Sequence, residues 1–165
     1  MDAIIYTTNA GTTAQYAKLL GEATGLPVYA LPDAGAVKPG ADVIYLGWLM
    51  ASQVKGYKKA VKRFNIKAVC GVGMAKSGLQ IEEIRKANSI PTLPVFTLQG
   101  GFDLNKLHGI YKLMMTVMKK TAGKGLSEKK DRTPEEDDML DMMLNGGNRV
   151  SADNLAPVLE WYRAQ

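Results

Sequence analysis

The sequence contains one cysteine and one histidine in 165 residues, and this scarcity excludes several kinds of chemistry. A single cysteine cannot form an intrachain disulfide, and the apolar run around Cys70 predicts a buried, inert thiol. One cysteine and one histidine are too few ligands for an ordinary zinc site, so no metal is expected. No apolar run is long enough to span a bilayer, and no signal peptide precedes the first strand-like segment. These absences predict a cytoplasmic protein.

The charge balance is basic, with a net charge of +5 and a pI near 9.2. Such a balance raises the question of an acidic partner. The basic residues are not interleaved with aromatic ones, and no nucleic-acid-binding module is recognisable. The Lys-rich stretch 55–63 is interpreted as the solvated face of an amphipathic helix over about 52–64. We therefore expect no nucleic-acid binding.

Short apolar runs alternate with helical patterns along the first hundred residues. This alternation predicts an α/β fold with a doubly wound, five-stranded parallel sheet, and right-handed crossovers place helices on both faces. The predicted strands are 3–6, 26–31, 42–47, 66–72 and 93–98, and the clearest helices between them are 13–24, 52–64 and 79–87.

Beyond Gly101 the pattern becomes helical. Residues 103–121 carry a wide stripe of Met, Leu, Ile and Tyr flanked by lysines, and a polar segment, 123–132, follows. Thr133-Pro-Glu-Glu is a strong helix start, and Ser151 opens a final helix. We expect one domain over 1–165, with a core at 1–125 that includes the helix inserted after the fifth strand, and a C-terminal helical extension at 126–165.

The most informative stretch is Ile4–Thr13, where a strand gives way to hydroxyl residues and then to a helix. In a parallel sheet this arrangement aims backbone N–H groups and a helix dipole at one point, which suits a phosphate. Gly11 permits positive φ, and the neighbouring side chains offer neutral donors. The loop lacks the lysine of a P-loop and the three glycines of a dinucleotide site, so a phosphomonoester fits better than a triphosphate. The alternative is that Thr12 or Thr13 merely caps the helix.

Two other loops should meet this one at the carboxyl edge of the sheet, given the flavodoxin-like strand order 2-1-3-4-5. The loop 47–53 would offer an apolar surface to a flat ring, and the loop 73–78 would offer peptide groups to its polar edge. The candidate contacts in these loops are Trp48, Leu49, Met50, Gly73, Met74 and Ala75. Trp48 could stack on a ring or only cover the end of the sheet.

Three segments together resemble the flavodoxin-domain proteins of the menaquinone-dependent protoporphyrinogen oxidase type. They are Tyr6–Thr13, Val43–Gly47 with Trp48 after it, and the Met- and Lys-rich run Gly100–Lys120. The resemblance covers residues 1–125 and implies non-covalently held FMN. It also implies that the phosphate lies on Thr8, Asn9, Gly11, Thr12 and Thr13. Ala10 departs from the family loop, which usually has Thr or Asp there, and so removes a side-chain contact.

The function predicted is that of an FMN-binding flavodoxin-like oxidoreductase, which transfers electrons or dehydrogenates an organic substrate. The alternatives are a small electron carrier that docks on acidic redox partners, and a fold relative without flavin. The ring-side loops hold Lys76 and no carboxylate, which predicts a flavin potential less negative than in acidic flavodoxins.

No residue is assigned a catalytic role, and His108 is expected to be exposed or at an interface. The Met-rich helix is expected to pack on the sheet. If its apolar stripe is exposed instead, it would contact a membrane surface or a quinone-reducing partner.

Overall fold

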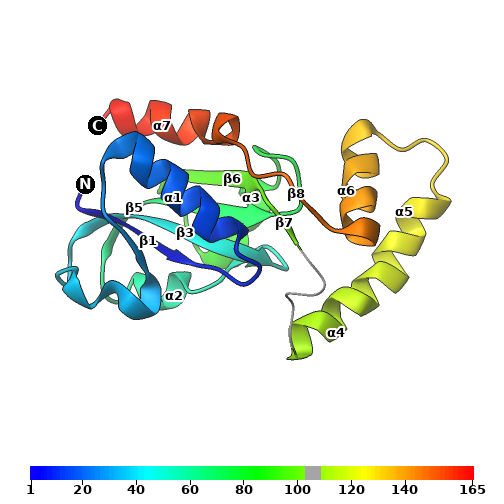
Figure 1. The fold of residues 1–165 in the computed structure, drawn as a ribbon, viewed down its shortest axis with the longest axis horizontal. Coiled ribbons are helices and arrows are strands. Elements are labelled where there is room, and N and C mark those ends of the chain that lie inside the picture. The colour runs from blue at the N-terminus through cyan, green and yellow to red at the C-terminus, as the bar shows by residue number, and fades with distance from the viewer. Residues whose placement is uncertain (103–108) are drawn as a thin grey trace.

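The computed structural model describes residues 1–102 and 109–165 and shows an α/β protein with a central, mostly parallel sheet (Figure 1). The five main strands are β1 (Ala3–Thr7), β2 (Val28–Ala30), β3 (Asp42–Met50), β5 (Asn65–Gly73) and β6 (Val95–Gln99). Their order across the sheet is β2-β1-β3-β5-β6, and all four neighbouring pairs are parallel. Counted as main strands, this is the order 2-1-3-4-5, so the predicted doubly wound, flavodoxin-like fold class is confirmed.

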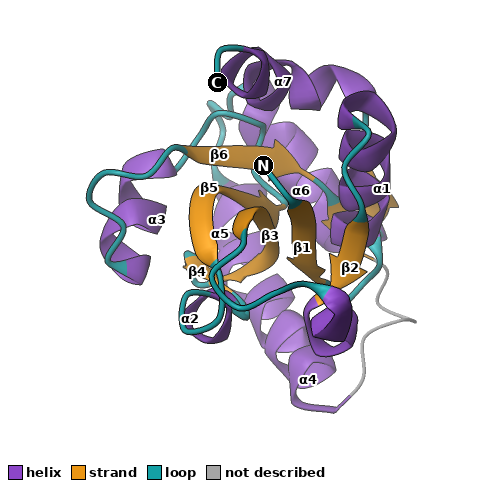
Figure 2. Cartoon of the chain, turned by 90° about the vertical axis from the view of Figure 1, so that its left-hand side faces the viewer, coloured by secondary structure: helices purple, strands orange, loops and turns teal. Residues whose placement is uncertain are grey.

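Helices cover both faces of the sheet (Figure 2). One face packs against α1 (Thr12–Thr24) and α7 (Ala156–Arg163), where Tyr16, Leu20 and Val158 are fully buried. The other face packs against η1 (Leu31–Ala36), α2 (Tyr57–Ala60) and α3 (Ile81–Asn88). The central strands are apolar on both sides, as strands of a covered parallel sheet must be.

Two predictions for the segment after β3 are wrong. The expected loop at 47–53 is strand as far as Met50, and the chain then turns back into β4 (Gln53–Val54), which pairs antiparallel with β3. The expected helix over 52–64 is only the single turn α2. The basic pattern predicts a helix face, but its apolar residues Tyr57, Ala60 and Phe64 anchor a compact turn in the core.

The segment after β6 makes an excursion away from the sheet. It leaves at β7 (Gly101–Phe102) and returns at β8 (Gly147–Asn148), and these two strands pair antiparallel. Between them lie α4 (Gly109–Met118), the π-helical turn η2 (Lys119–Gly123), α5 (Lys124–Glu128) and α6 (Pro134–Asn145). We call α4–α6 the helical arm. The polar segment 123–132 is helical as far as Glu128.

The helical arm lies beyond the end of the sheet, and α4 does not cover either face in Figures 1 and 2, so the prediction that this Met-rich helix packs on the sheet is wrong for its described residues. Leu113 and Val117 of α4 are 63% and 52% exposed. The predictions for residues 103–108, including His108, lie outside the described residues. Among the residues that the structure does describe, no helix is long and apolar enough to cross a membrane.

The chain after the helical arm returns to the core. The Thr133 side chain caps α6 as predicted, in a capping box with Glu136. Ser151 caps the short turn η3 (Ala152–Leu155), which leads into α7. Leu155 and Val158 are buried against the α1 face of the sheet, and Trp161 packs on Phe96 of β6. The final helix, which the sequence placed in an extension, is therefore one of the layers of the sheet domain.

Candidate functional site

The β1–α1 loop presents a row of backbone donors at the carboxyl edge of the sheet. Gly11 has φ 92° and is the N-cap residue of α1 without a side-chain cap, so the first turn of the helix is left open. Within the described residues, no hydrogen bond is made by the backbone N–H groups of Asn9, Ala10, Thr12, Thr13 and Ala14. A Cβ added at Gly11 would meet no atom within 4 Å. This geometry suits an anion, since open N–H groups and a helix dipole converge there.

The hydroxyl groups of the loop are used unequally. The Thr7 hydroxyl donates to the Lys55 carbonyl at 2.7 Å, so this hydroxyl is directed into the protein and does not face a ligand. The Thr8 Oγ1 accepts from the Gly11 N–H at 3.1 Å and keeps its own hydrogen for another acceptor. The Thr13 hydroxyl is enclosed and has no partner among the described residues, so it does not face the loop surface. Thr12 is therefore the helix-start hydroxyl left to a ligand.

The β3–β4 hairpin extends the centre of the sheet past this loop. Trp48, Leu49 and Met50 are half-buried residues at its tip. Leu49 packs over β5, where a Cβ on Gly71 or Gly73 would lie 2.9 or 3.0 Å from its methyl groups. Successive side chains of a strand point to opposite faces, so Trp48 lies on the side that α1 covers. Trp48 and Leu49 therefore cannot lie against the same face of a ring.

The hairpin is held in place by polar contacts that the sequence did not reveal. Asn88, at the end of α3, accepts from the Val54 N–H at 2.9 Å and donates to the Ser52 carbonyl at 2.8 Å. The Lys55 carbonyl accepts from the Tyr45 hydroxyl at 2.7 Å, and the Lys55 ammonium lies 5.9 Å from the centre of the Trp48 ring. Burial raises the pKa of Tyr45 to about 12, so this phenol stays protonated and remains a donor.

The β5–α3 loop is tied to the end of β6. The Gly78 N–H donates to the Thr97 hydroxyl at 2.8 Å, and the Ser77 hydroxyl accepts from the Gln99 N–H at 2.8 Å. The Gln99 side chain donates to the Met74 carbonyl at 3.3 Å. Gly73, Met74 and Ala75 are half-buried at this edge. The Met74 carbonyl thus already accepts one hydrogen bond, and the β5–α3 loop is fixed to the end of β6 by these contacts.

Helix α6 brings carboxylates to the same edge. The Gln99 amide donates to Asp138 at 2.5 Å, and Lys76 of the β5–α3 loop pairs with Glu135 at 3.0 Å. Arg149 bonds Asp138 at 3.0 Å and Asp141 at 2.9 Å. Its hydrogen bond with Asp138 raises the pKa of Arg149, and the Lys76 hydrogen bond lowers the pKa of Glu135. Each of these carboxylates therefore meets a cation, although the two ring-side loops contain no acid.

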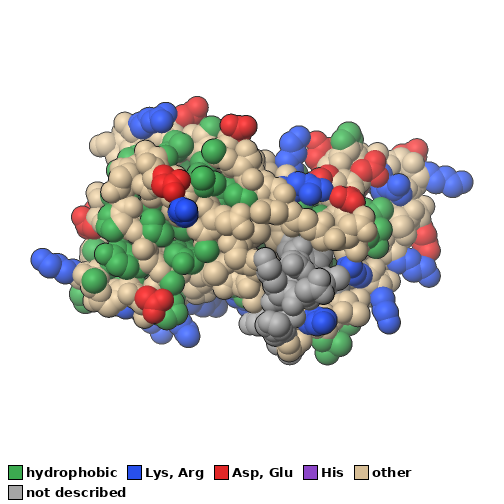
Figure 3. All heavy atoms as spheres, viewed as in Figure 1, with side chains coloured by type: hydrophobic (Ala, Val, Ile, Leu, Met, Phe, Trp, Pro, Cys, Tyr) green, Lys and Arg blue, Asp and Glu red, His purple; other side chains and the backbone are tan. Residues whose placement is uncertain are grey.

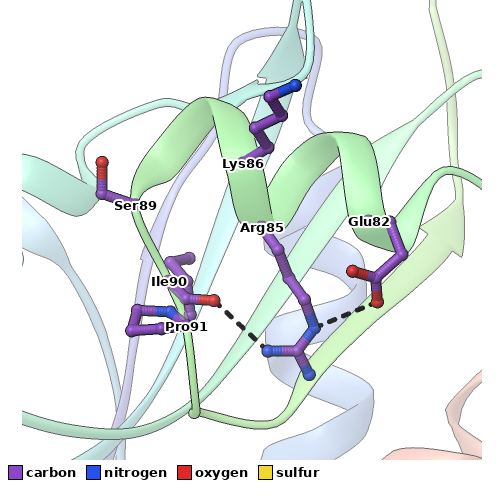
Figure 4. Close-up of a pocket in the computed structure, with 6 residues that line it drawn as sticks. All are labelled: Glu82, Arg85, Lys86, Ser89, Ile90 and Pro91. Atoms are coloured by element: carbon purple, nitrogen blue, oxygen red, sulfur yellow. Dashed lines mark hydrogen bonds and ion pairs between the residues drawn. The ribbon is translucent and has the colours of Figure 1, made fainter.

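A separate hollow lies beside α3 and does not coincide with this edge (Figure 4). It is lined by Glu82, Arg85, Lys86, Ser89, Ile90 and Pro91. The Arg85 guanidinium donates to the carbonyls of Ile90 and Leu93, at 3.3 and 2.8 Å, and pairs with Glu82 at 3.6 Å. Arg85 therefore fastens the end of α3 to the following loop, and we assign the hollow no binding role.

The structure thus gathers the predicted site residues along one edge, with differences in how each is presented. Thr12 lies beside Gly100, where an added Cβ would be 2.9 Å from its Oγ1, and Leu49 lies beside Gly73. Sequence reasoning missed Asn88, Gln99 and Asp138, because their partners are distant in the chain. The one available signal for these residues was the charge of α6, which ends next to Gly146-Gly147.

Comparisons of the chain with protein-family models, curated proteins and solved structures find no match.

Proposed function

We propose that this protein binds FMN at the carboxyl edge of its sheet and acts as a flavodoxin-like oxidoreductase. The observation that carries the proposal is the open β1–α1 loop, where positive φ at Gly11 leaves five backbone N–H groups without partners among the described residues. A phosphomonoester is the ligand that this donor set suits, since the loop contains no cation. The loop lies at the carboxyl edge of a sheet with flavodoxin-like strand order, and ligands of such folds bind at that edge, which supports the proposal.

The residues that would hold the cofactor fall into two groups. The backbone of 9–14 and the hydroxyls of Thr8 and Thr12 would bind the phosphate. The tip of the β3–β4 hairpin and the peptide groups of 73–75 would contact the ring, with Trp48 and Leu49 on opposite sides of the strand. Bound FMN would supply one- or two-electron transfer. The chain's own part is to anchor the phosphate, to position the ring and to set the charge around it.

The proposal is tested by titrating the purified protein with FMN and following the loss of flavin fluorescence. Riboflavin, which lacks the phosphate, should bind about 100-fold more weakly than FMN if phosphate anchoring contributes roughly 3 kcal/mol. Thr12→Val should weaken FMN binding several-fold by removing a donor. Thr13→Val is the matched control, because its hydroxyl is enclosed, and it should leave the affinity for FMN unchanged. Equal affinities for FMN and riboflavin, or no binding of either, would refute the proposal.

The second candidate, a small electron carrier that docks on acidic redox partners, shares this cofactor site and differs in its substrate. One observation favours it: the basic residues around α2 are concentrated on a compact turn instead of being spread along a helix. Reduction by an acidic redox protein without turnover of any small organic substrate would distinguish it from a dehydrogenase.

A further inference from the structure

Lysines gather on the short segment between β4 and β5. Lys58, Lys59 and Lys62 are exposed, whereas Tyr57, Ala60 and Phe64 on the inner side of the same turn are buried. Val61 is 43% exposed among these lysines. We call Lys55, Lys58, Lys59, Val61 and Lys62 the α2 basic surface. Because α2 is a single turn, the charges are held close together on a fixed part of the core.

The exposed lysines of the α2 basic surface have no carboxylate partner among the described residues. Lys58, Lys59 and Lys62 form none of the ion pairs, and Asp33 on the neighbouring turn η1 pairs with none of them. Some basic residues elsewhere are paired, as in Lys129–Glu136 at 2.6 Å and Lys67–Asp42 at 3.4 Å, so the distinguishing feature here is that three unpaired lysines lie within one short turn. In Figure 3, basic side chains project along the lower edge of the molecule, near η1 and α2. Part of the net positive charge is therefore concentrated here.

Lys55 connects this surface with the candidate ring site. Its N–H donates to the Trp48 carbonyl at 3.0 Å, and its carbonyl accepts from the Thr7 and Tyr45 hydroxyls, both at 2.7 Å. The backbone of Lys55 is thus fixed between β1 and β3, and its ammonium lies over the Trp48 ring. A partner that covers the α2 basic surface would lie next to the end of β3.

We propose that the α2 basic surface docks a redox protein with a carboxylate-rich surface. Its clustered and unpaired charge is complementary to such a partner, and the exposed Val61, next to Lys62 in the chain, supplies an apolar contact. The inference rests on the proposed function for one point only, namely that the partner exchanges electrons with a flavin at the adjoining edge.

Two other occupants fit this surface less well. Binding of single-stranded nucleic acid uses exposed aromatic rings for stacking, but Tyr57 and Phe64 are buried. The Arg63 guanidinium donates to the Ala34 carbonyl and lies 4.9 Å from the Phe64 ring, so it is already engaged. Insertion into a membrane requires a stripe of apolar residues, and this surface offers only Val61.

The test is to titrate the full-length protein with an acidic plant-type [2Fe–2S] ferredoxin at low ionic strength and to measure the dissociation constant by calorimetry. The triple variant Lys58→Glu, Lys59→Glu, Lys62→Glu should weaken binding by at least about tenfold, because each reversal turns attraction into repulsion. The control triple variant Lys112→Glu, Lys120→Glu, Lys130→Glu makes the same change in net charge at exposed lysines of and beside the helical arm. It should change the dissociation constant by about twofold or less.

Three outcomes would overturn the inference. The two triple variants could weaken binding equally, which would mean that only net charge acts. The ferredoxin could fail to bind at low ionic strength. The third outcome concerns an oligothymidylate and vesicles containing phosphatidylserine, which are titrated in parallel. If either binds more tightly than the ferredoxin, and the Lys58, Lys59, Lys62 variant loses that binding, the partner belongs to another class of macromolecule.

The same variants separate this inference from the proposed function. The α2 basic surface contributes no residue to the β1–α1 loop, so the Lys58, Lys59, Lys62 variant should bind FMN as the wild type does. If the protein binds the ferredoxin through this surface but does not bind FMN, the proposed function fails and the docking surface stands. If it binds FMN but not the ferredoxin, the reverse holds.

Discussion

Thr13 carries a buried hydroxyl that has no hydrogen-bond partner among the described residues. Leaving such a group unpaired costs roughly 1–3 kcal/mol, and valine has nearly the same shape without the hydroxyl. We predict that Thr13→Val raises the free energy of unfolding of the cofactor-free protein by about 1 kcal/mol, measured by denaturation in urea. Thr24→Val is the contrasting variant, because the Thr24 hydroxyl donates to the Leu20 carbonyl at 2.7 Å and its loss should not stabilise. A Thr13→Val protein less stable than the wild type would show that the hydroxyl has a partner.

Ala51 and Ser52 turn the β3–β4 hairpin with φ of 48° and 61°. These are left-handed values, which cost a residue with a Cβ roughly 1–2 kcal/mol and cost glycine little. Strain of this kind often marks a functional segment, and this hairpin carries the candidate ring contacts. We predict that Ala51→Gly stabilises the protein by about 1 kcal/mol in thermal or chemical denaturation. Ala36→Gly, at an exposed position without positive φ, should be neutral or destabilising.

At the scale of elements, the sequence predicted the parallel sheet well because its strands are apolar runs bounded by glycine and proline. The capping of α6 at Thr133 also follows from a local signal, whereas the order of the strands was taken from the flavodoxin-like fold. The β3–β4 hairpin could not be predicted, because it depends on Asn88, which lies 34 residues beyond Val54 in the chain. The pairing of β7 with β8 joins residues on either side of the helical arm and has no local signature either.

The candidate site was predicted in part. The loop at Gly11 could be expected, since a strand, a glycine and a helix start follow one another directly in the sequence. The positions of Trp48 and Leu49 on opposite faces follow from the extension of β3, which the uncharged sequence 47–53 did not indicate. The carboxylates of α6 were missed at this edge because the helical arm folds back over a long chain separation to bring Asp138 to Gln99.

The β7–β8 pair, which we call the neck of the helical arm, depends on glycine at position 101. A Cβ there would lie 2.0 Å from the Gly147 carbonyl oxygen, which is part of the backbone and cannot give way as a side chain could. The Arg149 N–H donates to the Gly100 carbonyl at 2.9 Å, next to this pair. We predict that Gly101→Ala opens the β7–β8 pairing and lowers the protection of the Arg149 amide against hydrogen exchange. Gly35→Ala is the control, because its Cβ would meet nothing within 4 Å. Unchanged protection in Gly101→Ala would mean that the neck adjusts.

Lowering the pH should destabilise α6 before it destabilises α1. Hydrogen bonds with Lys76 and Lys129 lower the pKa of Glu135 and Glu136 below the ordinary 4.5. The pKa of Asp141 is lowered from 3.8 by Asn145 and Arg149. Groups with a depressed folded pKa stabilise above their unfolded pKa, and this stabilisation is lost as the pH falls through the folded pKa. We therefore expect the exchange protection factors of α6 amides to fall below about pH 4.5. Protection of α1 that falls equally would indicate global unfolding instead.

Over the whole molecule, charge is arranged by region instead of being spread evenly. The α2 basic surface is unpaired, whereas the carboxylates that α6 brings to the carboxyl edge meet Lys76 and Arg149. The ring-side loops contain no acid, but α6 brings carboxylates to the same edge from another part of the chain. Carboxylates are present, but their pairing limits the negative potential at the edge, and a negative potential is what disfavours a reduced, anionic flavin.

The last prediction follows from that pairing and concerns the midpoint potential of FMN, if it binds as proposed. Lys76→Met leaves Glu135 without its cation, so the edge becomes more negative and the potential should shift to a more negative value. Lys67→Met is the matched control, because Lys67 pairs with Asp42 at the opposite end of the strands. Spectroscopic redox titrations of both FMN-loaded variants measure the two shifts. Since both variants lose one positive charge, a larger shift in Lys76→Met would arise from proximity to the ring, and equal shifts would contradict the placement of the ring at the carboxyl edge.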